Sequence, residues 1–216
     1  MSKFLDYLEF RQDHLLELGF EHAQVVTIAL VIASVIGVGT GIAVYRRERA
    51  ATVAIAIVGT FLTIPSFALL AMFIPIFGLG YEPTVVALVM YALLPIVRNT
   101  VTGLRQVDPA VIESAQGMGM GRVRRLLRIE LPLAWPIILT GIRVSALLLI
   151  GIAAIAAAVN GPGLGEDIFA GLARIGSASA TNLVLGGVLG VIVLALLFDL
   201  FFLLFGRLTT SRGIRA

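Results

Sequence analysis

The residues of this chain with the most chemical capacity form one polar stretch, Asp108 to Pro132, between long apolar segments. The stretch holds four arginines, three glycines and three carboxylates. Arginines and carboxylates make charge-assisted hydrogen bonds with a partner surface, and glycines allow sharp turns between short helices. The sequence therefore predicts that this stretch lies in water at one face of a membrane and docks against something there.

A short helix followed by a glycine elbow is expected at the start of this stretch. Asp108 is a good N-cap, and Pro109 is tolerated at the first helical position. Gly117, Gly119 and Gly121 should end the helix and allow a sharp turn. Such a helix suits transmission of a push from a partner, although an ordinary loop with snorkelling arginines has the same composition.

A second helix is expected to run from Arg122 back to the membrane. Its apolar stripe would be Val123, Leu126, Leu127 and Ile129, and its basic face Arg122, Arg125 and Arg128. Pro132 and Pro136 should kink or break this helix before it enters the bilayer.

The composition is that of an all-α integral membrane protein. The 216 residues are 59% hydrophobic and 13% charged, with a mean hydropathy of +1.03. A spanning helix needs about 20 mostly apolar residues. Five spans are predicted, of which the third should be extended by its flanks: Ala23–Val44, Ala51–Phe73, Thr84–Val97, a helix from Pro136 through Ala146–Val159, and Leu183–Phe205.

Basic residues predict the orientation of these spans. Of the sixteen, only Lys3, Arg11 and Arg174 do not follow the first, third or fifth span. The positive-inside rule then puts the N-terminus outside and the C-terminus in the cytoplasm. The predicted organisation is an external N-terminal segment 1–22, a transmembrane domain 23–206 with a cytoplasmic loop 98–140, and a cytoplasmic tail 207–216. The external segment is either an interfacial amphipathic helix or a solvated leader that orients the first span. Arg143 counts here among the charges between the third and fourth spans, and Arg207, Arg212 and Arg215 among those of the tail.

The chain lacks the motifs of an enzyme. A P-loop needs a lysine after its glycines, and the only lysine is Lys3. No Gly-x-Ser-x-Gly or His-Glu-x-x-His motif is present, and His14 and His22 lack further metal ligands. No cofactor or metal is therefore expected in this chain, and any ATP would be bound by a partner.

Polar and helix-breaking residues inside the spans are candidates for the walls of a substrate pathway. Proline frees carbonyl groups that a neighbouring helix or a pore must satisfy. For each candidate taken singly, helix packing is the competing interpretation. The candidates are Thr63, Pro65, Ser66, Tyr91, Pro95 and Asn99.

Other features inside and outside the spans have more than one interpretation. Asp199, a carboxylate well inside a span, either pairs with an arginine or serves an ion-gradient carrier or channel. Gly37-x3-Gly41 and Gly186-x3-Gly190 predict close helix packing. The outer segment Asn160–Thr181 should contain a short helix from Gly165, which either meets an external partner protein or is a capped surface helix.

The spacing of the polar stretch resembles the EAA signature of ABC-importer permeases. Glu113-Ser114-Ala115 is followed, after three residues, by Gly119 and, after nine more, by Ile129-x-Leu131-Pro132. Ser114 replaces the usual first alanine. The resemblance implies a type I importer fold similar to the methionine permease. It also implies a set of ATPase-coupling residues: Glu113, Ser114, Ala115, Gly117, Gly119, Arg122, Ile129, Leu131 and Pro132.

The same resemblance implies partners. These are a cytoplasmic ABC ATPase dimer that carries ATP and magnesium, a second permease subunit, identical or not, and a substrate-binding protein outside the bacterial cytoplasmic membrane. Binding of nucleic acid is not expected.

Further segments are similar to permeases for glycine betaine, choline and carnitine, which implies a quaternary ammonium substrate. The segments are Ile64–Ala71, Pro75–Gly80, Tyr91–Thr100, Gly163–Gly165, Ile168–Phe169 and Phe198–Asp199. No aromatic cage for such a cation is evident in the spans. The alternatives are an ABC permease for another small solute, such as an amino acid, and an ion-gradient carrier that uses Asp199.

Overall fold

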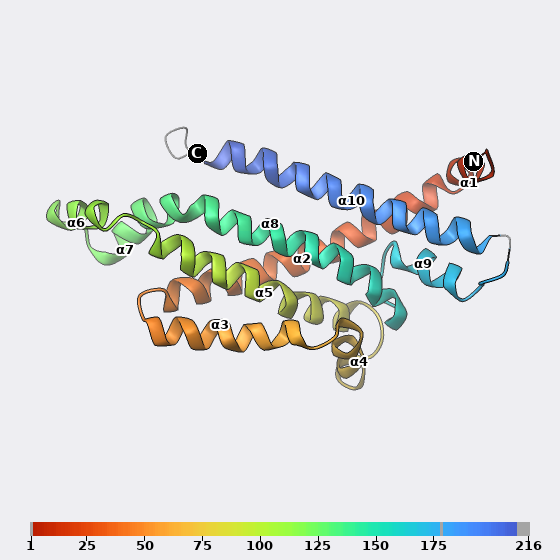
Figure 1. Ribbon diagram of the computed structural model, residues 1–216, viewed down its shortest axis with the longest axis horizontal. Coiled ribbons are helices and arrows are strands. Elements are labelled where there is room, and N and C mark those ends of the chain that lie inside the picture. The colour runs from red at the N-terminus through yellow and green to blue at the C-terminus, as the bar shows by residue number, and fades with distance from the viewer. Residues whose placement is uncertain (1, 178, 211–216) are drawn as a thin grey trace.

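The computed structural model describes residues 2–177 and 179–210, and every regular element within them is helical (Figure 1). Arg212 and Arg215 of the predicted tail lie outside the described residues. The elements are α1 Ser2–Phe10, α2 Gln12–Val44, α3 Glu48–Thr63, α4 Ser66–Phe77, α5 Tyr81–Arg105, α6 Pro109–Gly117, α7 Arg122–Arg125, a π-helical turn Leu126–Glu130, α8 Leu131–Ala156, a 3-10 turn Ala157–Val159, α9 Gly165–Leu172 and α10 Ala180–Thr209.

Four helical runs within the described residues are long and apolar enough to cross a membrane. They are α2, α5, the run from α7 through α8, and α10, and the bent pair α3 and α4 makes a fifth if it counts as one span. The predicted all-α membrane protein with up to five spans is confirmed at this level. The third span is extended by its flanks, as predicted, to Tyr81–Arg105.

Helix α5 lies at the centre of the bundle, between α2 and α8. Its neighbours approach through glycines: a Cβ on Gly37 or Gly41 would lie within 2.7 Å of a side-chain atom of Ile96 or Thr100. In lipid, such small residues allow the van der Waals packing that holds helices together. Gly186 and Gly190 likewise lie against Tyr7 and Leu164. The predicted close packing at both glycine pairs is confirmed.

The first spanning helix begins earlier than the sequence predicted, at Gln12 instead of Ala23. No proline interrupts residues 12–23, so the helix propagates through both histidines. His22 is fully buried, and its Nε2 lies 3.0 Å from the Ile150 carbonyl oxygen. His14 faces α9, where its Nε2 lies 3.2 Å from Asp167. Both histidines therefore lie within α2 and not before it.

The second span is broken at Ile64–Pro65, where α3 and α4 meet at 94°. The residue before a proline is pushed into extended backbone, and Ile64 has a ψ of 127°. The Tyr91 hydroxyl donates a hydrogen bond of 2.6 Å to the Ile64 carbonyl. The Ile64 carbonyl at the break is therefore satisfied by α5, which is one of the two alternatives expected for a carbonyl freed by proline.

Of the predicted kink or break at Pro132 and Pro136, the break is wrong, because one helical run continues from α7 through α8. In a regular helix, the Pro132 ring would clash with the carbonyl of Arg128 four residues earlier. The π-helical turn Leu126–Glu130 widens the backbone there and places Pro132 at the start of α8. Pro136 lies inside α8, and the Thr140 hydroxyl donates to its carbonyl.

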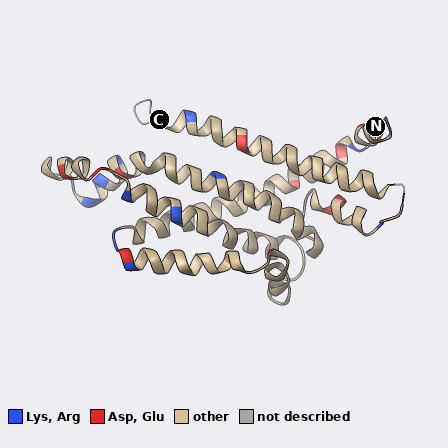
Figure 2. Ribbon diagram, in the orientation of Figure 1, with Lys and Arg blue, Asp and Glu red and all other residues tan. Residues whose placement is uncertain are grey.

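Basic residues gather along the chain at the end of the bundle that carries α6 and α7, as Figure 2 shows. Arg143 is an exception, because it lies inside α8 and not in a loop. Its Nε and Nη2 each donate a 2.7 Å hydrogen bond to the Asp199 carboxylate of α10. The count of loop charges that predicted the orientation should therefore leave Arg143 out, and Asp199 has an arginine of this chain as its partner.

At the opposite end, helix α9 begins at Gly165, as predicted. Its Asp167 is 4% exposed and accepts hydrogen bonds from Tyr7 and Arg11. These contacts tie α1 and the start of α2 to α9, so the N-terminal residues belong to the folded bundle.

Candidate functional site

Helix α6 lies beyond the ends of α5 and α8, where little covers it (Figure 1). Asp108 Oδ1 accepts a 2.8 Å hydrogen bond from the Ala110 N–H, and Pro109 is the first helical residue. The predicted cap is confirmed. Glu113 and Ser114 are exposed on this helix, and the Glu113 carboxylate contacts no other polar group among the described residues. The helix thus offers a free acidic surface.

The elbow behind α6 depends on one of its three glycines. Gly119 has a φ of +77°, in the region that only glycine enters without strain, whereas Gly117 and Gly121 do not have positive φ. The Met120 N–H returns to the Ala115 carbonyl at 3.1 Å and closes the turn. Ala115 is fully buried, so its small side chain lets the elbow close and does not face a partner.

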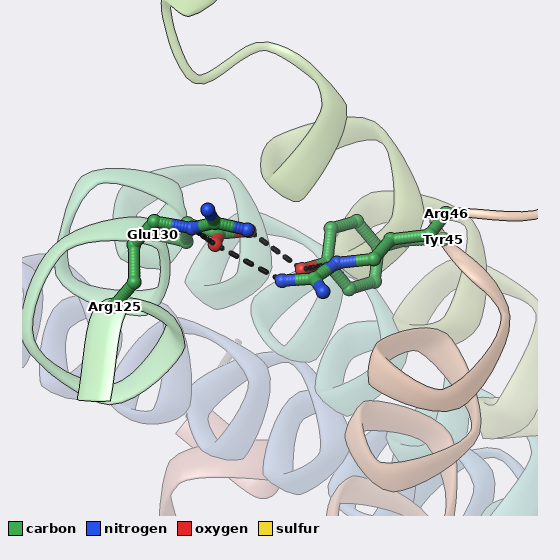
Figure 3. Close-up of polar contacts among 4 residues, drawn as sticks. All are labelled: Tyr45, Arg46, Arg125 and Glu130. Atoms are coloured by element: carbon green, nitrogen blue, oxygen red, sulfur yellow. Dashed lines mark hydrogen bonds and ion pairs between the residues drawn. The ribbon is translucent and has the colours of Figure 1, made fainter. Parts of the chain in front are cut away.

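A carboxylate that the sequence analysis did not single out, Glu130, anchors the elbow to the bundle (Figure 3). Glu130 is 1% exposed. It accepts hydrogen bonds from the Tyr45 hydroxyl at 2.6 Å, Arg125 Nε at 2.7 Å and Arg46 Nη2 at 3.2 Å. Three donors balance the cost of burying this charge. The end of α2 and the returning helix are therefore held together by one buried ion-pair cluster, which we call the Glu130 cluster.

The Glu130 cluster also reaches α5. Arg105 Nε donates a 2.8 Å hydrogen bond to the Tyr45 carbonyl. Burial, and then the hydrogen bond to Glu130, raise the pKa of the Tyr45 phenol further above neutral pH, where a phenol is already a hydrogen-bond donor. The Glu130 cluster therefore connects the segment behind α6 to the ends of α2, α5 and α8.

The second helix of the polar stretch differs from the prediction. Arg125 is 7% exposed and paired with Glu130, so it does not share an exposed face with Arg122 and Arg128. Of the predicted apolar stripe, Leu126 and Ile129 are half-buried, whereas Val123 and Leu127 are 70% and 60% exposed. The π-helical turn shifts the register of the helix, which turns Arg125 inward and the two apolar side chains outward.

The remaining predicted coupling residues surround this cluster on the same segment. Arg122 and Pro132 are exposed, and Ile129 and Leu131 are half-buried. In the chain, Ile129 and Leu131 flank Glu130. Glu130 occupies the position between them that the EAA signature leaves free. The sequence did contain an indication of this ion pair, because Glu130 is the one carboxylate that follows the four closely spaced arginines of this stretch.

The candidate pathway residues lie at two places in the bundle. Thr63, Pro65 and Ser66 are at the break between α3 and α4, next to Tyr91 on α5. Pro95 and Asn99 lie further along α5, where Asn99 Nδ2 donates to the Pro95 carbonyl at 2.8 Å. A Cβ on Gly141 of α8 would lie 2.7 Å from the Asn99 Cβ. Asn99 therefore faces the contact between α5 and α8.

Residues 33–211 match the family described as the binding-protein-dependent transport system inner membrane component. The chain belongs to this family. It is 37% identical to the glycine betaine/carnitine/choline transport system permease protein OpuCB of Bacillus subtilis, over all of this chain and 97% of that protein. It is 36% identical to the osmoprotectant import permease protein OsmW of Salmonella typhimurium, over 98% of this chain and 99% of that one.

The permease fold also matches a solved structure. An inward-facing form of the MetNI methionine ABC transporter aligns with a TM-score of 0.80 at 24% identity, over 91% of this chain and 96% of the other. This likeness confirms the predicted methionine-permease-like fold. The permease is a multi-pass component of the inner membrane and a transport subunit, as the sequence predicted.

Proposed function

We propose that this permease imports quaternary ammonium osmoprotectants, such as glycine betaine, choline or carnitine. Two relatives named for these solutes match the full length of this chain at 37% identity, and one named for osmoprotectant import matches 98% of it at 36%. These matches are the observation that carries the substrate assignment. An amino acid is the competing cargo within the same transporter class, and the likeness to a methionine transporter concerns the fold alone.

The proposed energy source is ATP bound with magnesium by a pair of ATPase subunits. The permease has a single lysine, Lys3, which no P-loop surrounds. In this proposal, α6 inserts into a cleft of the ATPase, and its Glu113 side chain points away from the permease and contacts the ATPase. Closure of the ATPase pair then moves α6, and the Glu130 cluster passes the motion to α2, α5 and α8.

The proposed orientation places α6 in the cytoplasm and the N-terminus outside. The arginines at the α6 end support this, even with Arg143 left out. A second permease subunit, identical or not, would complete the pathway, with Thr63, Pro65, Ser66, Tyr91, Pro95 and Asn99 as candidate wall residues. An external binding protein would deliver the substrate, and α9 is our candidate for its contact.

Uptake in proteoliposomes tests this proposal against a carrier that uses Asp199. With the ATPase and the binding protein present, radiolabelled glycine betaine is expected to accumulate only with ATP. Collapse of the ion gradients should leave uptake unchanged. The charge-neutral double variant Arg143→Gln/Asp199→Asn should retain uptake, because Asp199 pairs with Arg143 and carries no ion in this account.

Two results would contradict the proposal. Gradient-driven uptake without ATP, lost in the double variant although the protein folds, would show a carrier. ATP-driven uptake of an amino acid but of no quaternary ammonium compound would replace the substrate and keep the transporter class. The single variant Asp199→Asn is the less useful probe, because it leaves Arg143 without its counter-charge within a spanning helix.

A further inference from the structure

A basic hollow of about 750 Å³ lies between the end of α2 and the elbow behind α6. Arg46, Arg47, Arg122 and Arg125 line it. Among residues 2–177 and 179–210, the one carboxylate that pairs with any of them is Glu130, which contacts Arg46 and Arg125. Four arginines and one carboxylate leave three positive charges. The guanidinium groups of Arg47 and Arg122 have no partner among the described residues, so the hollow has charge available for an anion.

Apolar surface continues from the basic hollow along the membrane side of the protein. A second hollow of about 200 Å³ shares Ala43, Arg46 and Arg122 with the first and adds Ile42, Val123 and Leu126. A groove of about 500 Å³ follows one helical turn further along α2, between Val38, Leu127 and Leu131. The exposed Val123 and Leu127 thus lie beside the junction of charge and apolar surface.

A basic hollow that leads into an apolar groove suits a molecule with a phosphate group joined to an acyl chain. A phosphate group needs the arginines, and an acyl chain needs the apolar groove that leads from them. Basic pockets between spanning helices at the cytoplasmic side are where anionic lipid headgroups bind. A free phosphate or an acidic protein loop would use the basic hollow but leave the groove empty.

We propose that this composite site, which we call the arginine groove, binds one anionic phospholipid with its phosphate between Arg47 and Arg122. The inference rests on the proposed function only in placing this end of the bundle at the cytoplasmic face. Because Arg46, Arg122 and Arg125 belong to the segments that hold α6, the bound lipid becomes part of the support of the elbow. The arginine groove thus links the lipid composition of the membrane to the coupling segment.

Native mass spectrometry of the intact transporter, released from nanodiscs of phosphatidylglycerol and phosphatidylcholine, tests the site. The wild type should retain phosphatidylglycerol in preference to phosphatidylcholine. Arg47→Gln should lower the affinity for phosphatidylglycerol about fivefold, since one basic residue near a membrane surface contributes about that factor. Arg49→Gln is the matched control: Arg49 is exposed two residues away and does not line the hollow.

A second variant tests the site without changing its charge. Ala43→Phe should also reduce retention, because Ala43 is exposed and lines both the basic hollow and its apolar neighbour. Three results would overturn the proposal: equal retention by Arg47→Gln and the wild type, displacement of the lipid by inorganic phosphate, or release of the ATPase by Arg47→Gln. The last result would make the hollow a protein contact. Failure of the wild type to bind any ATPase would contradict the proposed function. Lipid retention would then still be decided by the comparison of Arg47→Gln with the wild type.

Discussion

A lysine in place of Glu113 is expected to abolish ATP-driven uptake while the permease still folds. Glu113 is exposed on α6 and has no intramolecular partner among the described residues, so the change has little effect on stability. In the docked state, the lysine would place an unmatched charge in the ATPase contact. Loss of a desolvated charge contact costs about 2 kcal/mol or more, so affinity for the ATPase should fall about 30-fold or more.

Association with the ATPase, measured by surface plasmon resonance on permease in nanodiscs, checks this result beside uptake. Glu48→Lys is the matched control, because Glu48 is an exposed carboxylate at the same end of the bundle, on α3. Gly119→Asp should behave like Glu113→Lys for a different reason, since Gly119 has a φ of +77° that an aspartate adopts with strain. Uptake and association that survive both changes would refute the coupling role of α6.

Removal of the Glu130 carboxylate is expected to cause the largest loss of stability. Glu130→Ala leaves Arg125, 7% exposed, without its counter-charge. Breaking a buried pair in this way costs about 3 kcal/mol. Tyr45→Phe removes one neutral donor and keeps the ion pair, so it should cost about 1 kcal/mol. The free energy of unfolding should therefore fall in the order wild type, Tyr45→Phe, Glu130→Ala.

Unfolding can be followed through the single tryptophan, Trp135, which lies near the start of α8. Glu113→Ala serves as the control, because this exposed carboxylate of the same segment should change stability by less than about 0.5 kcal/mol. The double variant Arg125→Met/Glu130→Ala should recover part of the loss, since it removes the stranded charge. Equal stability of Glu130→Ala and Glu113→Ala would show that the Glu130 cluster does not anchor the elbow.

Local chemistry explains which parts of the site could be predicted from the sequence. The start of α6 follows from the Asp108 side chain and the Pro109 ring, and the elbow follows from Gly119, so each lies within a few residues of its cause. The fold followed from composition, span lengths and the resemblance carried by the EAA spacing. The glycine pairs Gly37-x3-Gly41 and Gly186-x3-Gly190 predicted close helix contacts because only small residues permit them.

The missed features depend on contacts between distant parts of the chain. Tyr45 and Glu130 are 85 residues apart, so no local pattern pairs them. The inward position of Arg125, just before the π-helical turn, likewise goes with its hydrogen bond to Glu130, which in turn contacts the end of α2. Arg143 was counted among the charges between the third and fourth spans, but it lies inside α8, where Asp199, 56 residues away in the sequence, neutralises it.

Site-specific photo-crosslinking tests the central claim, that α6 is the ATPase contact, most directly. The chain contains no cysteine, so a single introduced cysteine can carry the crosslinker. With Val111→Cys on α6, the account predicts a crosslink to the ATPase subunit that changes in yield when ATP is added. Ile175→Cys, 80% exposed beyond α9 at the opposite end, should give none. A crosslink to the ATPase from Ile175→Cys, with none from Val111→Cys, would contradict the account.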